Sequence, residues 1–540
     1  MRRSAVVVFA VLVTLGMLAP PSFAQAPAPK VTISGLVDFV TTYYKNLSYQ
    51  AQQDVTNNKE KNWYSRERGV FTLTGEVGKV KGVWAVELDF TNGAGNFNTS
   101  NNGSLGVVGV AANGTSANFD LDTDIQGAIE TKWLYAEAPV TGPGSLMPFI
   151  PVPTIGRFGA QPARGHEYKP GIIFAGDFPG VSLETTWAPN LRSTVTFVQI
   201  GEALDRFVAS NQKDNIAFLA SVEFDVFKGL TIKPTYAYGH WDGGNCGGNA
   251  LGTPAWGGLN TIANCPAVVT GSVAGAGGVG RDITRHYFGG DVRWSMGPFS
   301  LQPTLLFMVG EQEVNRRGGG VNDVDIRSFH FDTVAGFRTG PLLVEVRGFW
   351  NPGMEANHDP QNGGGGTIRR WDAINSGFNF LSGWSEIWKS GTDYNAGFLV
   401  GRSAVTARES VGYDKYGRIF LGLAADYSLT PALTLTGLAN VSWTDTEVDT
   451  KGVLGATGIV PSTTPHTGGK ERYLGSEWIA RMTYRFAANV AFELTQAVLV
   501  TGDALNIQRA AAADRCVTDG VSTCQSRNIW KTSARMRVTF

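Results

Sequence analysis

The feature that most constrains the fold is a long series of segments in which apolar and polar residues alternate. In the first segment Val31, Ile33 and Phe39 share one parity, whereas Ser34 and Asp38 share the other. Residues at i and i+2 lie on the same face of a strand, so each segment predicts a strand with one apolar and one polar face. The segments run to about 10 residues, the length that a tilted strand needs to cross a bilayer, and they continue to residue 540.

The connections between these segments alternate in length. Turns of two to five residues alternate with long loops rich in Gly, Asn, Thr and Ser, near 91–127, 242–282, 351–416, 444–473 and 501–526. Trp84 and Trp187 lie beside short turns, and Trp350 and Trp478 lie beside long loops. Short periplasmic turns, long extracellular loops and two aromatic girdles are typical of a transmembrane β-barrel. A soluble β-protein would have to produce both patterns by chance.

We therefore predict an all-β fold, a transmembrane antiparallel up-and-down β-barrel. If the first and last strands begin and end at the periplasmic side, the pattern gives about 18 strands, an even number as closure requires. The strand assignments are weakest in 128–139, 152–162 and 351–416, so 16 or 20 strands remain open alternatives.

The N-terminus has the pattern of a secretory signal peptide. Arg2 and Arg3 precede an apolar run over residues 5–18, and Ser22-Phe23-Ala24 offers a cleavage site after small residues. A single anchoring helix is the alternative, but the run is shorter than the roughly 20 residues of a membrane span. We expect residues 1–24 to be removed near Ala24 and residues 25–540 to form the barrel.

The charge balance argues against nucleic-acid binding. Lys and Arg number 45 and Asp and Glu number 46, so the formal net charge is −1. A protein that binds phosphate backbones requires a basic surface. We expect no nucleic-acid partner.

The last alternating segment runs from Trp530 through Ala534 and Met536 to an aromatic residue, Phe540. In this respect the chain resembles the bacterial outer-membrane porins of Gram-negative cells, which are large β-barrels of about 16–18 strands. The resemblance implies outer-membrane lipid as surroundings, Phe540 as a signal read by the barrel-assembly machinery, and a homotrimer.

The polar faces of the strands carry charges of both signs. One interpretation is a basic stripe on the last three strands that attracts anions. The other is a charge-paired lattice, because Asp38, Glu76 and Glu87 lie across the closing seam from that stripe. The candidate pore-lining residues on the strands are Arg157, Arg293, Asp332, Arg338, Arg347, Arg481, Arg485, Arg535 and Arg537.

Two connections are candidates for folding into the barrel. Segment 163–180 is similar in position to the early loop that porins fold inward, and Arg164, Glu167, Tyr168 and Lys169 would then line a constriction. An ordinary external loop is the alternative.

The 351–416 loop is long enough to plug or cover the barrel. Its three tryptophans, Trp371, Trp384 and Trp388, would either stack on a sugar or pack the loop, and we favour packing.

The four cysteines form two close pairs, Cys246 with Cys265 and Cys516 with Cys524, each inside one long loop. An exported location favours disulfides, and local pairing avoids linking distant loops. Without C-x-x-C or histidines at ligand spacing, we expect no metal site and no cofactor.

These patterns predict a channel for the passive diffusion of small hydrophilic solutes or ions, with a weak anion preference. One alternative is a barrel that scaffolds or sheathes a partner such as an electron-transfer protein. The other is an outer-membrane enzyme, which we disfavour because His330 and Asp332 are two residues apart on one strand face and are expected to line the lumen. The sequence leaves the transported solute open.

Overall fold

The structure is a computed structural model, and nearly all of its described residues lie in strands or in the connections between them. It describes residues 28–46, 61–92, 129–202, 214–241, 283–315, 321–355, 366–374, 381, 383–388, 416–448, 453–455, 458–460, 471–505, 507–508, 523–524 and 528–540. None of the described segments is a helix long and apolar enough to cross a membrane.

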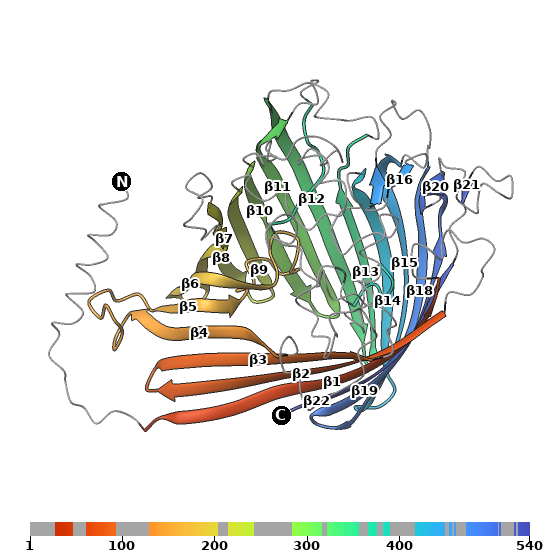
Figure 1. The fold of residues 1–540 in the computed structure, drawn as a ribbon. Helices are drawn as coiled ribbons and strands as arrows, with labels where there is room; N and C mark the ends of the chain where they lie inside the picture. The colour runs from red at the N-terminus through yellow and green to blue at the C-terminus, as the bar shows by residue number, and fades with distance from the viewer. Residues whose placement is uncertain are drawn as a thin grey trace, which may run out of the picture.

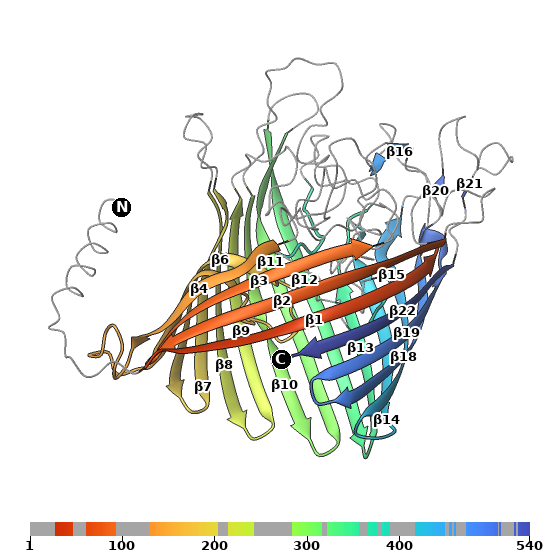
Figure 2. The same ribbon diagram turned by 60° about the horizontal axis from the view of Figure 1, so that its bottom comes forward.

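Eighteen strands form one sheet, and each pairs antiparallel with its neighbours (Figures 1 and 2). Their bounds are β1 (Lys30–Lys45), β2 (Lys61–Val77), β3 (Val80–Asn92), β4 (Ile129–Thr141), β5 (Thr154–Pro162), β6 (Asp177–Ala188), β7 (Leu191–Glu202), β8 (Asp214–Phe227), β9 (Leu230–Trp241), β10 (Ile283–Met296), β11 (Phe299–Asn315), β12 (Val321–Thr339), β13 (Leu342–Asn351), β14 (Arg418–Ser428), β15 (Leu433–Val448), β18 (Glu471–Ala487), β19 (Val490–Thr501) and β22 (Ile529–Thr539).

The smaller elements lie in the connections between barrel strands. They are the hairpin β16 (Val453–Gly455) with β17 (Gly458–Val460), the 3-10 turn η4 (Asp503–Leu505), and the pair β20 (Ile507–Gln508) with β21 (Thr523–Cys524).

The sheet closes where the first strand meets the last. β1 pairs with β22 from Leu36 opposite Thr539 to Lys45 opposite Trp530, and its other edge pairs with β2. Every strand edge of the sheet thereby has a hydrogen-bonded neighbour, as a barrel in lipid requires. The predicted fold class, a closed antiparallel up-and-down barrel of 18 strands, is confirmed.

Connection length alternates as predicted, with two exceptions. The connection 142–153 between β4 and β5 has 12 residues, although it lies at the end of the barrel where the other described turns have two to four. At the opposite end, β11 and β12 are joined by only five residues, 316–320. The prediction of uniformly tight turns at one end and long loops at the other was therefore wrong at these two places.

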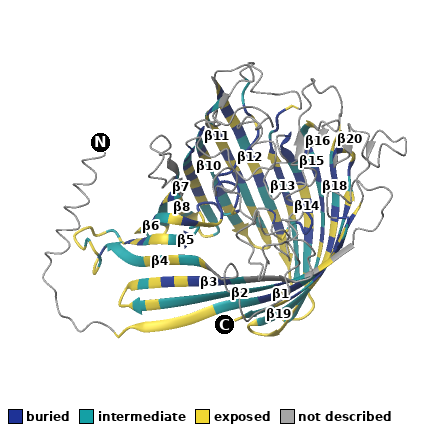
Figure 3. Cartoon of the chain, in the orientation of Figure 1, coloured by how far each residue is buried: buried dark blue, intermediate teal, exposed yellow. Residues whose placement is uncertain are grey.

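The two faces of the wall differ as the alternation predicts. Outward side chains such as Ile33, Leu305 and Leu423 are apolar and exposed, which suits contact with lipid. Inward side chains such as Asp38 and Thr304 are polar and buried. Figure 3 shows this alternation of exposed and buried residues along the strands.

An apolar core also lies inside the barrel. Inward side chains of several strands, including Leu306, Met308 and Phe420, pack in one cluster with side chains from two connections, including Ile172 and Trp371. The lumen is thus partly filled by the chain itself. We call residues 163–176 the first inner segment, and residues 366–374 with 383–388 the second inner segment.

Candidate functional site

The first inner segment follows the inner wall of the barrel across several strands. Arg164 contacts β6, where its Nε donates to the Ser182 hydroxyl and its Nη1 lies 3.0 Å from the Glu184 carboxylate. The next contact is with β9, where the Lys233 amine donates to the Gly165 carbonyl at 2.5 Å. Further along, the Tyr168 backbone N–H donates to Asp291 on β10. These contacts place the segment inside the barrel.

His166 anchors this segment to two strands at once. Its Nδ1 lies 3.1 Å from the Ser221 hydroxyl on β8, and its Nε2 lies 2.8 Å from the Thr196 hydroxyl on β7. The ring is buried, and the charges of Lys233 and Arg164 are nearby. Burial, reinforced by those two charges, lowers the pKa of His166 to about 3. His166 is therefore neutral at pH 7.

Glu167 shapes the turn that follows. Its carboxylate accepts the backbone N–H groups of Gly171, Ile173 and Phe174 at 2.8, 2.8 and 3.2 Å. The side chain is buried, so it fixes the backbone of the segment rather than facing water. Burial, together with the Asp291 carboxylate, raises the pKa of Glu167 to about 8.

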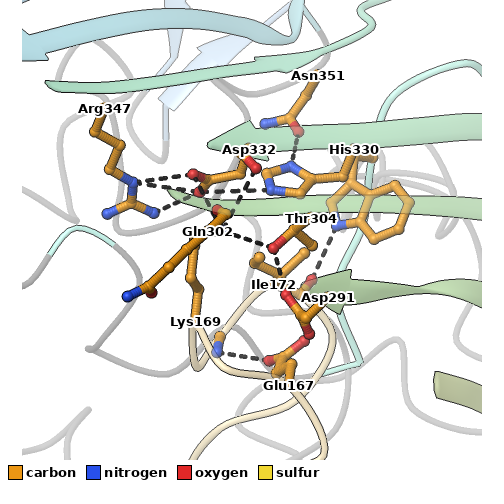
Figure 4. A network of polar contacts seen from close by, with 12 residues as sticks. Glu167, Lys169, Ile172, Asp291, Gln302, Thr304, His330, Asp332, Arg347 and Asn351 are labelled. Atoms are coloured by element: carbon orange, nitrogen blue, oxygen red, sulfur yellow. Dashed lines mark hydrogen bonds and ion pairs between the residues drawn. The ribbon is translucent and has the colours of Figure 1, made fainter. Parts of the chain in front are cut away.

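Lys169 carries the segment on to β11 and β12. Its amine donates to the Gln302 carbonyl at 2.7 Å and the Thr304 hydroxyl at 2.6 Å, and it lies 3.8 Å from the Asp332 carboxylate. Asp332 is also paired with Arg347 on β13, at 2.6 Å (Figure 4). Lys169, Asp332 and Arg347 are all buried, so this network ties the segment to the wall.

His330 and Asp332 share one strand face, as the sequence indicates, but both are inaccessible. The His330 Nδ1 contacts the Asn351 side chain, its Nε2 lies 3.8 Å from Asp332, and its ring lies 5.6 Å from that of Trp371. Both side chains are fully buried. A reacting substrate has no access to this pair in this arrangement.

The second inner segment packs on the first. The Trp371 indole donates to the Ile172 carbonyl at 2.9 Å, and the Ile374 N–H donates to the Ile173 carbonyl at 2.8 Å. On the wall side, Asp372 pairs with Arg285 of β10 at 2.9 Å. Trp371 and Trp388 are buried in the inner core, so packing accounts for both rings.

The later part of the second inner segment is bound to the opposite wall. Glu386 pairs with Arg481 of β18 at 2.5 Å and with Lys531 of β22 at 3.1 Å. In return, Glu477 of β18 accepts the N–H groups of Glu386 and Ile387, both at 2.8 Å. The two inner segments together therefore connect the β6–β13 side of the barrel to the β18–β22 side.

The basic stripe on the last strands is neutralised at the closing seam. Asp38 of β1 accepts hydrogen bonds from both Arg535 and Arg537 of β22. Arg535 also lies 3.5 Å from Glu493. Glu87 turns away from the stripe and pairs with Arg68 and Lys132. This arrangement favours the charge-paired lattice over an uncompensated basic stripe.

Charged side chains are exposed in the part of the lumen near the short turns. Arg293, Arg338 and Arg485 lie on inward strand positions, and among the described residues no acid lies within ion-pair distance of them. The Arg293 guanidinium stacks on the Tyr168 ring, 3.6 Å from its centroid. Arg157, in contrast, is paired with Glu137 at 2.6 Å. This half of the lumen presents an exposed, charged wall.

Sequence reasoning missed the inner apolar core, although the signal is present. In β11, Leu305, Leu306, Phe307, Met308 and Val309 are all apolar, so both faces of the strand are apolar there. A strand that is apolar on both faces is covered on both faces. The outer face meets lipid, and the inner face meets the two inner segments.

Some predictions fall outside what the structure describes. Residues 1–27, Cys246, Cys265 and Cys516 are outside the described residues, and Cys524 lies in β21 without a described side chain. The signal peptide and both disulfides remain predictions. Within the described residues, no three His, Cys, Asp or Glu side chains are grouped as metal ligands would be.

Comparison with known proteins finds likeness only among solved structures. No protein-family model and no curated protein matches this sequence. OccAB4 of Acinetobacter baumannii shares 8% identity at a TM-score of 0.46, with 96% of this chain and 99% of that chain covered. OccK5 (OpdH) of Pseudomonas aeruginosa shares 11% identity at a TM-score of 0.43, with 94% and 98% covered. OpdK of Pseudomonas aeruginosa, solved with vanillate, shares 10% identity at a TM-score of 0.44, with 94% of this chain and 98% of that chain covered.

These solved structures are outer-membrane porins, the class that the sequence pattern resembles. Their identity to this chain is too low to transfer any solute or site.

Proposed function

We propose that this chain forms an outer-membrane channel through which small hydrophilic solutes and ions diffuse passively. The observation that carries the proposal is the closed 18-stranded wall, apolar outside and charged inside. Closure satisfies the backbone in lipid, and barrels of this size have room for an aqueous channel. The inner segments narrow that channel and set the size of solute that passes.

The exposed inner charges give a weak anion preference. Arg293, Arg338 and Arg485 contribute positive charge near the short turns, and Glu345 and Asp426 on the same part of the wall offset it. Arg481 of β18 and the bases of β22 contribute little, because Glu386, Glu493 and Asp38 compensate them.

The candidate pore-lining residues divide into three groups by their surroundings. Arg293, Arg338 and Arg485 face the open lumen and act on the passing solute, and Tyr168 supports Arg293, whose guanidinium stacks on its ring. A second group holds the constriction in place through paired contacts, namely Arg164, Glu167, Lys169, Asp332, Arg347 and Arg481. The remaining three pair between neighbouring strands of the wall, Arg157 with Glu137, and Arg535 and Arg537 with Asp38.

Export and assembly form part of the same proposal. Residues 1–24 direct the chain out of the cytoplasm, and the barrel-assembly machinery reads Phe540 as it inserts residues 25–540 into the outer membrane. A homotrimer, suggested by resemblance, is the proposed assembly.

The two alternatives are less well supported. A sheath for an electron-transfer partner needs a free lumen, whereas the chain's own inner segments occupy its middle. An enzyme needs an accessible catalytic group, and the His330/Asp332 pair is fully buried.

Single-channel recording in planar bilayers under a KCl gradient tests the proposal. We expect steady ohmic openings and a reversal potential of the sign given by weak anion preference. A folded, heat-modifiable sample that never conducts would show that the inner segments or a bound partner close the lumen. A partner that copurifies with such a sample would support the sheath.

A further inference from the structure

The connection 142–153 is unlike the other described turns at its end of the barrel. It spans 12 residues, Gly142-Pro143-Gly144-Ser145-Leu146-Met147-Pro148-Phe149-Ile150-Pro151-Val152-Pro153, and none of them is charged. The other described turns at this end, such as 78–79 and 228–229, have two to four residues. Figures 1 and 2 show the connection extending sideways beyond the ends of β4 and β5.

Its large apolar side chains are exposed. Phe149 is 79% exposed and Leu146 is 72% exposed, the two highest values among the exposed large hydrophobic residues of the described chain. Ile150 is exposed as well, and so are Val77 and Val80 at the adjacent turn. Water is an unfavourable environment for so much exposed apolar surface.

Part of the backbone of the connection is hydrogen-bonded, within the connection and to the adjoining end of β4. Four of its 12 residues are proline and have no N–H. The N–H groups of Gly142, Leu146, Met147 and Ile150 donate to carbonyls of Ile150, Pro139, Val140 and Met147, at 2.8 to 3.2 Å. Four of its eight N–H groups are thus paired, which lowers the cost of entering an apolar medium, where each unmet polar group is costly.

The surroundings of the connection are those of a membrane interface. Outward residues at the same end of neighbouring strands, Trp84, Ile155 and Trp187, are exposed and belong to the apolar outer surface. At the adjacent turn the exposed Lys79 donates to the Pro143 carbonyl at 3.1 Å. An aromatic belt with a lysine at its edge is typical of the headgroup region.

We propose that residues 142–153 form a membrane anchor that inserts Leu146, Phe149 and Ile150 into the lipid leaflet at the short-turn side of the barrel. The occupant is lipid because the surface is uncharged, exposes large apolar side chains and adjoins the lipid-facing wall. The anchor holds this side of the barrel at a fixed depth. The inference rests on the proposed function only in placing the barrel in a membrane.

Site-directed spin labelling in phospholipid vesicles tests the anchor. Phe149→Cys is labelled in a chain whose four native cysteines are serine, and collision rates with oxygen and with a water-soluble nickel chelate are compared. Leu305→Cys, on the outer face of β11, is the lipid-exposed control, and Lys228→Cys, in the 228–229 turn, is the water-exposed control. We expect the oxygen-to-nickel ratio at 149 to match that at 305 and to exceed that at 228 several-fold.

Three other outcomes would overturn the inference in distinguishable ways. A ratio at 149 equal to that at 228, with 305 still lipid-exposed, rejects the anchor and leaves the channel proposal standing. Water exposure at both 149 and 305 rejects the membrane placement itself. Dipolar broadening at 149 that disappears on dilution with unlabelled protein assigns the surface to contact between copies.

A photocrosslinker gives a second measurement that leaves the native cysteines in place. With p-benzoylphenylalanine at position 149, we expect lipid adducts by mass spectrometry and few at position 228. Protein dimers instead of lipid adducts at 149, or no adducts beyond those at 228, reject the anchor.

Discussion

Gly35 and Phe540 exchange two backbone hydrogen bonds across the closing seam of the barrel. The Gly35 N–H donates to the Phe540 carbonyl at 2.9 Å, and the Phe540 N–H donates to the Gly35 carbonyl at 3.1 Å. The Phe540 ring then packs beside Phe71 of β2, with 5.8 Å between the ring centroids. The C-terminal residue therefore contacts the first two strands of the barrel.

A side chain at position 35 should weaken this seam. A Cβ there would lie 2.5 Å from the Phe540 ring and 2.8 Å from the Val70 carbonyl oxygen, and overpacking of this kind costs about 1–3 kcal/mol. We expect Gly35→Val to lower the temperature at which the folded band is lost in heat-modifiability gels. Gly75→Val is the control, because no atom lies within 4 Å of its Cβ. If both variants lose the folded band at an equally lowered temperature, replacing a strand glycine, and not the contact with Phe540, destabilises the barrel.

Loss of the acid at the seam should affect both stability and selectivity. Asp38→Asn leaves Arg535 with only Glu493 and leaves Arg537 unpaired, and removing one partner of a buried pair costs on the order of 3 kcal/mol. We expect lower thermal stability and a reversal potential shifted toward anion selectivity.

Arg192→Gln provides the control for the seam variant. It removes a pair with Glu223 in which the arginine side chain is 48% exposed, and such pairs contribute about 0–1 kcal/mol. If Asp38→Asn changes neither property more than Arg192→Gln does, the seam pairs are not structurally important.

The closing seam and the two faces of the barrel wall could be predicted from the sequence. The reason is that the alternation of apolar and polar residues along a strand is a local pattern. Asp38 was expected to lie across the seam from the basic stripe, and the structure pairs it with two of the stripe's arginines. Glu87 was expected there too, but it pairs with Arg68 and Lys132 instead. Parity gives the face of a residue, whereas the register between strands decides which charges meet.

The inner segments could be suspected from the sequence, but their contacts could not be derived. His166, for example, binds hydroxyls that follow it by 30 and 55 positions. Periodicity contains no information about such long-range pairing. The exposed connection 142–153 was missed for a related reason, since its prolines and glycines resemble an ordinary break between strands.

Acidification should loosen the first inner segment through His166. The pKa of His166 is about 3 when the segment is docked and 6.5 for an imidazole outside this site. Between pH 3 and pH 6.5 the undocked segment therefore binds more protons than the docked one. The free energy that keeps residues 163–176 docked therefore becomes more favourable as pH rises across this window, and it is lost as pH falls below 6.5. At pH 5 the loss is about 2 kcal/mol. We expect hydrogen exchange in 163–176 to be faster at pH 5 than intrinsic rates predict.

The non-titrating variant isolates this effect. His166→Gln keeps a side chain that can hydrogen-bond, so its exchange in 163–176 should show no extra acceleration at pH 5 relative to pH 7. Glu167, whose pKa of about 8 gives the opposite pH dependence, is present in both proteins and cancels in the comparison. The same acceleration in both proteins would show that His166 does not control docking.

Removing the ring that joins the two inner segments should open the channel. Trp371 is buried, bonded to the Ile172 carbonyl and packed edge-on against Tyr287 with 5.6 Å between centroids; truncating such a side chain costs about 3–5 kcal/mol. We expect Trp371→Ala to raise single-channel conductance and current noise. Trp478→Ala is the control, since this ring is 59% exposed on the outer face and its loss should leave conductance unchanged. Unaltered conductance in Trp371→Ala, with the barrel still folded, would mean that the solute path bypasses the contact between the inner segments.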